Sequence, residues 1–511
     1  MTNHLAGILG IGDTARHARP FARIEDGRSL SYGDVEAQSA RFAAALVGLG
    51  VRPGDRVAVQ VEKSIEALML YLGCIRAGGV FLPLNTAYTP AELGYFVGDA
   101  EPALVVCDPA RAEALRPHAE AAGARLETMG VWAAGGGDHG SIFAHLPEGA
   151  AFSDVARGPE DLAAILYTSG TTGRSKGAML SHENLGSNAA VLAEHWRFTT
   201  EDVLIHALPI YHTHGLFVAT NTTLVAGSSL LFMQKFDAGA VLTAMGEATA
   251  LMGVPTFYTR LLGEAGLTPE RCRGMRLFVA GSAPLLAETH RQWETRTGHA
   301  ILERYGMTEC SMITSNPYDG ARRAGTVGHP LPGVSLKVTH EETGADMARG
   351  EIGMIRVKGP NVFRGYWRMP EKTAEELSSD GWFITGDLGM IDDEGYVVIV
   401  GRGKDLIISG GFNVYPKEVE GEIDRLPGVV ESAVIGVPHP DFGEGVVAVV
   451  VPEAEARRDQ NRVLEPLGER LAKFKQPKRV IFVDALPRNA MGKVQKKDLR
   501  EAYADLFQPA L

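Results

Sequence analysis

The segment LAAILYTSGTTGRSKG, residues 162–177, constrains the fold more than any other part of the chain. Its apolar first part ends at Tyr167 and predicts a buried strand. The part that follows is rich in Ser, Thr and Gly and ends on Arg174 and Lys176. Glycines let backbone N–H groups turn toward an anion, hydroxyls add neutral donors, and the lysine adds positive charge. We therefore predict a loop that binds phosphate groups.

The spacing in this loop is G-x-x-G-x-x-K, which differs from the G-x-x-x-x-G-K-[ST] pattern of P-loop nucleotidases. A P-loop also requires a helix directly after its lysine, and the sequence after Lys176 does not predict one there. A Walker-type nucleotidase is therefore the weaker interpretation. A flexible surface loop is the structural alternative, and motifs elsewhere in the chain have to decide against it.

The composition indicates a globular enzyme rather than a nucleic-acid-binding or membrane protein. A chain of 511 residues can bury a large core and should divide into two or more domains. Its net charge of -12 makes nucleic acid an unfavourable partner. No apolar run reaches the length of a membrane span, and the first residues lack the pattern of a signal peptide, so we expect a cytoplasmic protein. The four cysteines show no metal or redox spacing.

Helical and strand patterns alternate between Leu30 and Cys107, which predicts a layered α/β domain. Thr89-Pro90-Ala91-Glu92 combines a capping box with a proline in the first helical turn. Further apolar runs end in polar residues at 203–215, 253–260, 277–284 and 302–309. In open α/β sheets the ligand crevice lies at the carboxyl ends of the strands. We therefore expect these junctions to line one site.

His212 and His214 stand one residue apart within the first of these junctions. Such a pair can bind a metal ion, but no third ligand follows at a suitable spacing. Half-buried histidines with ordinary hydrogen bonds are the alternative that we favour.

After Gly333 apolar and polar residues alternate, as is typical of antiparallel sheet. This pattern predicts a small β-barrel subdomain over about 331–400. A helix start at Pro416 and strand patterns at 432–437, 446–451 and 480–483 then predict a separate α+β domain. We place the boundary between residues 403 and 404.

Five motifs in this order carry a resemblance to a known family. They are the glycine-rich loop 167–176, Tyr305-Gly306-Met307-Thr308-Glu309, Thr385-Gly386-Asp387, Gly401-Arg402-Gly403-Lys404-Asp405 and Pro487-Arg488-Asn489-Ala490-Met491-Gly492-Lys493. Together they resemble the adenylate-forming acyl-CoA synthetases over nearly the whole chain. The resemblance implies a large N-terminal domain, 1–403, of layered α/β subdomains plus a distorted β-barrel, and a mobile C-terminal α+β domain, 404–511.

The resemblance also implies a two-step reaction with ATP, Mg²⁺ and coenzyme A. A carboxylate attacks the α-phosphate of ATP and gives acyl-AMP and pyrophosphate, and the thiol of coenzyme A then displaces AMP. Because the first step brings an anion toward a triphosphate, cations and N–H donors must neutralise its transition state. The other partners expected are small molecules only, with neither nucleic acid nor membrane.

The resemblance assigns roles residue by residue. The implied nucleotide site comprises Thr168, Ser169, Gly170, Thr171, Thr172, Gly173, Arg174, Ser175, Lys176, Gly281, Ser282, Ala283, Glu303, Tyr305, Gly306, Met307, Thr308, Asp387 and Arg402. Within it, Tyr305 would stack on adenine and Asp387 would accept hydrogen bonds from the ribose. Thr171 and Glu309 would position Mg²⁺. Taken singly, each of these residues also fits a structural turn or an ion pair.

Lys493, His212 and Glu309 are the implied catalytic residues, and Lys493 would bridge the substrate carboxylate and ATP. In the second step the C-terminal domain would turn about Lys404 and withdraw Lys493. Gly410 and Gly411 would then let the pantetheine arm pass close to the backbone. Acetylation of Lys493 would remove its charge, which makes regulation by acetylation a hypothesis.

The acyl pocket is expected to contain Arg304 and Arg260, with His212 and Ser282 beside them. A buried arginine is costly unless it is paired, and a fatty or aryl acid offers no partner. A second carboxylate on the substrate would pair with it bidentately. The segments 208–215 and 303–309 look like those of malonyl-CoA synthetases. We therefore expect malonate as the acid, with methylmalonate as a second candidate.

Four alternatives remain open at this point. Arg304 could form an internal ion pair with Glu303 or with another carboxylate. A ligase for another short or aryl acid would keep every motif but turn Arg260 and Arg304 away from the pocket. A carrier-loading adenylation enzyme would share only the first step, and no carrier segment is evident. A non-catalytic adenylate-binding protein would require the loss of Lys176 or Lys493, and both are present.

Overall fold

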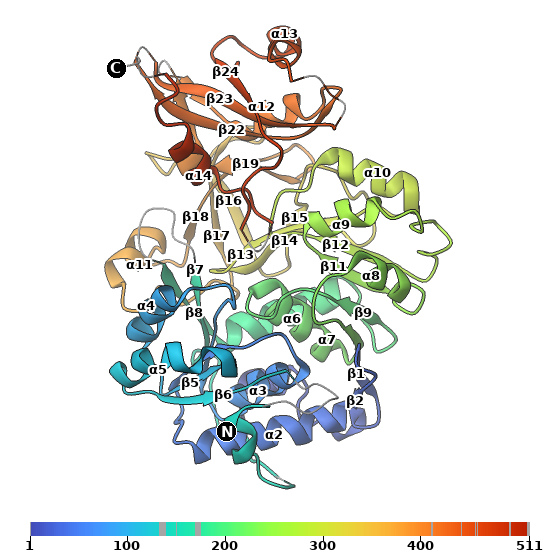
Figure 1. Ribbon diagram of the computed structural model, residues 1–511, viewed down its shortest axis with the longest axis vertical. Helices are drawn as coiled ribbons and strands as arrows, with labels where there is room; N and C mark the ends of the chain where they lie inside the picture. The colour runs from blue at the N-terminus through green and yellow to red at the C-terminus, as the bar shows by residue number, and fades with distance from the viewer. Residues whose placement is uncertain are drawn as a thin grey trace. The chain divides into compact units, whose positions relative to one another are not determined.

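The computed structural model describes residues 2–131, 139–149, 151–168, 175–409, 412–440, 442–454, 456, 458–489 and 492–507. The chain separates into two compact units (Figure 1). Unit 1 contains residues 1–324, 329–335 and 358–383, and unit 2 contains residues 325–328, 336–357 and 384–511. The predicted domain boundary at 403/404 falls inside unit 2 and stays a prediction.

A six-stranded sheet forms one layer of unit 1. Its order is β6 (Arg125–Thr128), β5 (Leu104–Cys107), β3 (Arg56–Gln60), β4 (Val80–Pro83), β7 (Leu162–Thr168) and β8 (Lys176–Ser181). All neighbours are parallel except β7 and β8, which pair antiparallel. The apolar run 162–167 is therefore a buried strand, as predicted.

A nine-stranded sheet forms the other layer of unit 1. Its order is β15 (His329–Pro330), β14 (Ser311–Ser315), β13 (Leu302–Met307), β12 (Leu277–Ala280), β11 (Ala250–Gly253), β9 (Val203–His206), β10 (Ser229–Phe232), β1 (Pro20–Ile24) and β2 (Ser29–Ser31). The central strands from β13 to β1 are parallel, and antiparallel pairs occur at both edges. The loops after β9, β12 and β13 consequently leave the same edge of the sheet.

Helices pack between and around these sheets (Figure 1). They are α1 (His4–Ile8), α2 (Tyr32–Gly48), α3 (Ile65–Arg76), α4 (Pro90–Ala100), α5 (Ala112–Ala121), α6 (His182–His195), the π-helix η4 (His214–Thr220), α7 (Asn221–Ala226), α8 (Ala238–Ala244), α9 (Pro255–Leu262), α10 (Ala287–Thr297) and α11 (Pro370–Glu376). Thr89 and Glu92 form the predicted capping box at α4. Every residue of α3 is buried, so this helix belongs to the core.

Unit 2 contains two sheets. The first has the order β16 (Ser335–Thr339), β17 (Gly353–Lys358), β18 (Phe383–Ile391) and β19 (Val397–Arg402). It lies within the region predicted as a β-barrel subdomain, and the barrel itself stays a prediction. The second contains β20 (Ile407–Ser409), β21 (Phe412–Val414), β22 (Val429–His439), β23 (Gly443–Pro452) and β24 (Arg479–Phe482), with helices α12 (Pro416–Ile423), α13 (Asn461–Arg470) and α14 (Lys496–Ala502). The predicted α/β class and the smaller C-terminal α+β part are confirmed.

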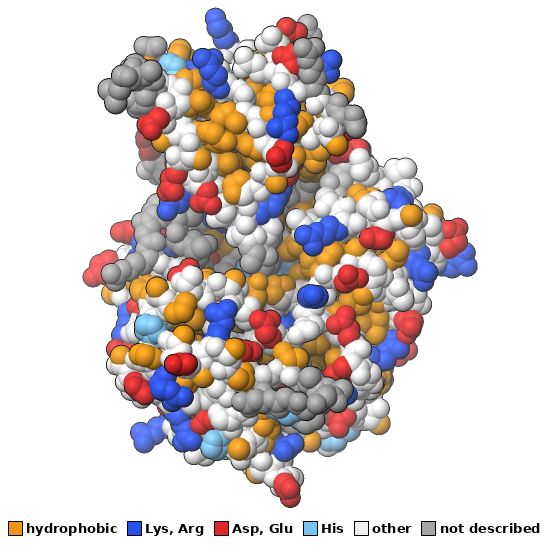
Figure 2. Space-filling view, viewed as in Figure 1, with side chains coloured by type: hydrophobic (Ala, Val, Ile, Leu, Met, Phe, Trp, Pro, Cys, Tyr) orange, Lys and Arg blue, Asp and Glu red, His pale blue; other side chains and the backbone are white. Residues whose placement is uncertain are grey.

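Charged side chains of both signs are interspersed over the face drawn in Figure 2, without a continuous basic surface there. Among the described residues, no helix combines the length and the apolar character needed to cross a membrane.

Asp424, which follows α12, gives unit 2 a pH-dependent stability. Its carboxylate accepts a hydrogen bond of 2.7 Å from Ser432 Oγ, and burial raises its pKa from 3.8 to about 7. The folded chain therefore binds more protons than the unfolded chain between about pH 4 and pH 7, and stability falls as the pH rises through this range.

We expect Asp424→Asn to raise the melting temperature at pH 8, because the amide has no charge to bury. The gain should correspond to about 1 kcal/mol or more at pH 8, should be clearly smaller at pH 5, and should vanish only below the ordinary pKa of 3.8. Thermal unfolding of both proteins at the two pH values measures this. An equal gain at pH 5 would show that the carboxylate does not titrate as described.

Candidate active site

The two ends of the predicted phosphate loop lie next to each other on β7 and β8. Thr168, the last residue of β7, pairs with Lys176, the first residue of β8, and Thr168 Oγ1 donates to the carbonyl oxygen of Lys176 at 3.4 Å. A strand rather than a helix thus follows the lysine, as the spacing predicted. The residues between them, Ser169, Gly170, Thr171, Thr172, Gly173 and Arg174, lie outside the described residues.

Helix α4 holds both ends of this loop. Tyr95 Oη donates to the carbonyl oxygen of Ser175 at 2.8 Å, and Tyr167 Oη donates to Asp99. The rings of Tyr95 and Tyr167 also meet edge to face at 6.2 Å. The capped helix α4 therefore fixes where the loop begins and where it ends.

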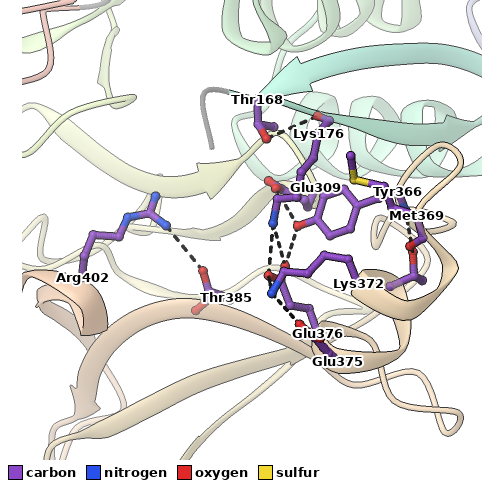
Figure 3. A network of polar contacts seen from close by, with 11 residues as sticks. Thr168, Lys176, Glu309, Tyr366, Met369, Lys372, Glu375, Glu376, Thr385 and Arg402 are labelled. Carbon is purple, nitrogen blue, oxygen red and sulfur yellow. Dashed lines mark hydrogen bonds and ion pairs between the residues drawn. The ribbon is translucent and has the colours of Figure 1, made fainter. Parts of the chain in front are cut away.

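Lys176 takes part in a network of polar contacts within unit 1 (Figure 3). Its Nζ lies 3.1 Å from Glu376 Oε1 and 3.3 Å from Glu376 Oε2. The same ammonium group sits 4.1 Å from the centre of the Tyr366 ring, where it gains a cation–π interaction. Both partners come from the segment 366–376, about two hundred residues away in the sequence.

Tyr366 links this ion pair to Glu309. Its hydroxyl lies 2.6 Å from Glu376 Oε2 and 3.0 Å from Glu309 Oε1 (Figure 3). Glu309 stands in the turn between β13 and β14 and is only 6% exposed. Burial, followed by the nearby Glu309 and Glu376 carboxylates, raises the pKa of Tyr366, so the phenol keeps its proton.

Glu309 is suited to a hard cation because a carboxylate oxygen is a ligand that Mg²⁺ prefers. The other implied ligand, Thr171, belongs to the part of the loop outside the described residues. Among the residues that the structure describes, no group of three or more His, Cys, Asp or Glu side chains is arranged to hold a metal ion.

Arg304 lies on β13 and is 4% exposed. Its guanidinium group packs against the backbone of Gly281, where a Cβ atom would collide with it. Glycine after β12 is therefore what makes room for this side chain. Nε and Nη2 of Arg304 are buried without a hydrogen-bond partner among the described residues.

Burying the Arg304 guanidinium without a partner costs free energy. Burial lowers the pKa of Arg304, yet a guanidinium remains charged near neutral pH. A buried charge without a partner costs several kcal/mol. The site is thus prepared for an anion that the described part of the chain does not supply.

Glu303 does not supply that anion. Its carboxylate lies 3.1 Å from His290 Nδ1 on α10. Adjacent residues of a strand point to opposite faces, so Glu303 and Arg304 face different sides of β13. The alternative of an internal Glu303–Arg304 ion pair is therefore wrong. The nucleotide contact predicted for Glu303 stays a prediction.

His212 and His214 lie near Arg304, at the start of η4. Burial, followed by the charge of Arg304, lowers the pKa of His212 to about 4 and also lowers the pKa of His214. Both rings are therefore neutral at pH 7. His214 Nδ1 lies 3.3 Å from Ser282 Oγ, while His212 Nδ1 and His214 Nε2 are buried without a hydrogen-bond partner in the described chain.

Ser282 adopts a left-handed backbone conformation, with φ of 71°. Such a conformation is unfavourable for a residue with a side chain and is concentrated at functional sites. It follows Gly281 directly after β12, at the sheet edge where the sequence predicted a ligand crevice. The structure therefore brings together the predicted residues Gly281, Ser282, Arg304 and His212.

A buried pair behind these residues was not predicted. Lys63 Nζ lies 3.0 Å from His206 Nδ1 and 2.8 Å from the carbonyl oxygen of His206. His206 Nε2 lies 2.9 Å from the carbonyl oxygen of Gly215, so it carries the proton and donates. Burial lowers the pKa of both side chains. The pair fixes the chain at the start of η4, next to His212 and His214.

Arg260 does not lie where the sequence predicted. Pro255 begins helix α9, so residues 255–262 form a helix rather than a strand end. Arg260 stands in the last turn of α9, and its side chain is exposed. Of the two predicted pocket arginines, only Arg304 is therefore buried. The substrate contact predicted for Arg260 stays a prediction.

Unit 2 contains a separate group of predicted residues. Asp387 on β18 pairs in register with Arg402 on β19, and their side chains form an ion pair of 2.8 Å. Burial, followed by the charge of Arg402, lowers the pKa of Lys493. Burial also lowers the pKa of Lys404 to about 8. Gly410 and Gly411 lie outside the described residues.

Comparison with known families identifies the protein. A model described as AMP-binding enzyme matches residues 13–367, and a model described as AMP-binding enzyme C-terminal domain matches residues 418–493. The chain belongs to the AMP-binding enzyme family. It is an adenylate-forming acyl-CoA ligase, and hence an AMP-forming acid–thiol ligase; enzymes of this kind generally use ATP and coenzyme A.

Individual members of the family resemble the chain over nearly its full length. The ATP-bound structure of MatB from Rhodopseudomonas palustris is 60% identical, covers 99% of this chain and 100% of its own, and superposes with a TM-score of 0.96. The malonate–CoA ligase of Arabidopsis thaliana is 35% identical and covers 93% of this chain and 85% of its own. A benzoate CoA ligase from Burkholderia xenovorans LB400 is 27% identical, with a TM-score of 0.87 over 98% of this chain and 100% of its own.

We predict that Tyr95→Phe weakens ATP use. The change removes the hydrogen bond to the Ser175 carbonyl but keeps the aromatic ring. Loss of one such bond, about 1 kcal/mol, should raise KM for ATP about fivefold and leave KM for the acid nearly unchanged. Steady-state assays with each substrate varied test this. Tyr88→Phe removes a hydroxyl from the same aromatic cluster and serves as the control; equal effects of the two changes would contradict the anchoring role.

Proposed function

We propose that this acyl-CoA ligase uses malonate, converting malonate, ATP and coenzyme A to malonyl-CoA, AMP and pyrophosphate through malonyl-AMP. The observation that carries the proposal is the buried Arg304 guanidinium with two unpartnered nitrogens. Malonate presents a second carboxylate at the end of a short chain, and this group can accept hydrogen bonds from Nε and Nη2. The Arabidopsis relative, named for malonate, supports the same choice.

The electrostatics of the pocket favour an acid that is charged at both ends. A carboxylate paired with Arg304 regains much of the interaction that the guanidinium loses on burial. The neutral His212 ring can donate to a carboxylate without adding a charge that would require a counter-ion. An aryl or long-chain acid would leave Arg304 unpaired. Methylmalonate has the same two carboxylates and is the second candidate.

We assign the remaining roles as the family resemblance implies them. Lys176 and the loop 168–175 bind the β- and γ-phosphates, and Tyr305 stacks on adenine. Asp387, held in place by its ion pair with Arg402, accepts hydrogen bonds from the ribose hydroxyls. Glu309 with Thr171 would hold Mg²⁺, which neutralises phosphate charge when bound. The residues Gly281, Ser282, Ala283, Gly306, Met307 and Thr308 complete the nucleotide site.

Lys493 is assigned to the first half-reaction only. Its ammonium group neutralises the charge that builds up as the carboxylate approaches the α-phosphate. The C-terminal domain, from residue 404 onward, then turns about Lys404. Gly410 and Gly411 let the pantetheine arm of coenzyme A pass close to the backbone.

The substrate proposal is tested with a panel of acids. We expect wild-type enzyme to prefer malonate over acetate, butyrate and benzoate in pyrophosphate release. Arg304→Ala should lower kcat/KM for malonate about 100-fold or more, because it removes a buried charge-assisted contact. The same change should leave kcat/KM for acetate within a few-fold. Arg304→Lys should recover only part of the loss, since lysine cannot form the bidentate contact.

The exposed Arg260 provides an internal comparison, and Arg260→Ala should cost less than Arg304→Ala. A wild-type preference for acetate or benzoate would refute the malonate proposal while leaving the ligase assignment intact.

Lys493→Ala should separate the two half-reactions. We expect the rate of adenylation, measured by pyrophosphate exchange, to fall by about 100-fold or more, because one positioned cation is removed from the transition state. Thioester formation from supplied malonyl-AMP should stay within a few-fold of wild type. Lys497→Ala is the control, since Lys497 lies in the same segment with a side chain that is 69% exposed. Equal losses in both half-reactions would rule out the assignment.

A further inference from the structure

The ion pair between Lys176 and Glu376 connects two parts of unit 1 that the catalytic assignments do not relate. Glu376 is the last residue of α11, and its carboxylate meets the Lys176 ammonium with both oxygens, at 3.1 and 3.3 Å. The two side chains are 19% and 22% exposed, so water screens the pair only in part. The Glu376 carboxylate thus contacts the same Lys176 ammonium group that we assign to the phosphates of ATP.

Within the described part of the chain, Glu376 has two partners besides Lys176 (Figure 3). Lys372 Nζ lies 3.0 Å from Glu376 Oε1, and the Tyr366 hydroxyl lies 2.6 Å from Glu376 Oε2. Partial burial raises the pKa of Glu376, but the hydrogen bonds from Tyr366, Lys372 and Lys176 outweigh it and lower the pKa below its ordinary value. Glu376 is therefore an anion at the pH at which ATP binds.

We propose that Glu376 is an internal counter-ion that competes with the phosphates of ATP and of pyrophosphate for Lys176. It is a positioning residue: it acts on these ligands only through the lysine. The inference rests on the proposed role of Lys176. In the ligand-free chain Glu376 and the Tyr366 ring hold the lysine in one place, and a polyphosphate must displace the carboxylate to bind it.

The geometry makes this exchange inexpensive for the protein. When Lys176 turns to a phosphate, Glu376 keeps Lys372 and Tyr366, so no carboxylate is left buried without a partner. The reverse exchange assists product release, because Glu376 recovers the lysine when pyrophosphate departs. AMP has no β- or γ-phosphate, so its binding does not require the exchange.

The test is the direct binding of nucleotides to Glu376→Gln. Glutamine keeps the size of the side chain and can still accept from Tyr366, but it removes the competing charge. We expect α,β-methylene-ATP and pyrophosphate, measured by titration calorimetry with Mg²⁺, to bind about three- to tenfold more tightly than to wild type. AMP should bind equally to both proteins. Pyrophosphate should also become a stronger inhibitor of the forward reaction by a similar factor.

Glu375→Gln is the matched control. Glu375 precedes Glu376 on α11, is exposed, and contacts Lys372 at 2.7 Å rather than Lys176. Its substitution changes the net charge by the same amount and should leave all three affinities unchanged. Weaker binding of α,β-methylene-ATP to Glu376→Gln, or an equal change for AMP and for the ATP analogue, would overturn the proposal.

A double-variant cycle separates this inference from the role of Lys176 itself. Lys176→Ala should weaken α,β-methylene-ATP, and adding Glu376→Gln to it should have no further effect, because the two act through one contact. If Lys176→Ala leaves the affinity unchanged, the assigned role of Lys176 is wrong. If Lys176→Ala weakens binding but Glu376→Gln has no effect on its own, only the counter-ion proposal fails.

Discussion

A guanidinium group that is buried without a hydrogen-bond partner for two of its nitrogens among the described residues is the constraint on which the proposed acyl pocket depends. Burial of Arg304 costs desolvation free energy, and the residues around it hold the side chain in place. Gly281 leaves the space that the group fills, and the neutral rings of His212 and His214 lie near it without a charge that could neutralise it. An anionic ligand would offset this cost, so we expect the pocket to select its acid by charge rather than by apolar fit.

Lys176 and Arg304, the cations of unit 1 to which we assign anionic ligands, differ in their surroundings. Lys176 has a protein counter-ion, Glu376, and a flexible side chain that can exchange one anion for another. Arg304 has neither a described carboxylate partner nor room to move, because its guanidinium fills the space above Gly281. The lysine is thus suited to a ligand that binds and leaves in each turnover as a polyphosphate. The arginine is suited to recognising one fixed group of the acid.

Local sequence signals predicted the elements around the phosphate loop well. Strand β7, the absence of a helix after Lys176, and the capped start of α4 all follow from residues adjacent in the sequence. Arg260 was misplaced because the apolar run before it was extended past Pro255. A proline at that position more often begins a helix, and here it begins α9.

Contacts between distant segments could not be predicted. Tyr366 and Glu376 reach Lys176 across about two hundred residues, and nothing in their own segment marks them as part of a nucleotide site. Lys63 and His206 are likewise joined only by the fold, since about 140 residues separate them in the sequence. The missing signal in each case is the tertiary packing of segments far apart in the sequence, which periodicity does not specify.

The most direct test of the account is a crystal structure of the enzyme with malonate and a non-hydrolysable ATP analogue. The account predicts that one malonate carboxylate lies within about 3 Å of Nε or Nη2 of Arg304, while the other faces the α-phosphate. A structure in which Arg304 pairs with a carboxylate of the protein, or in which malonate binds away from it, would contradict the central claim.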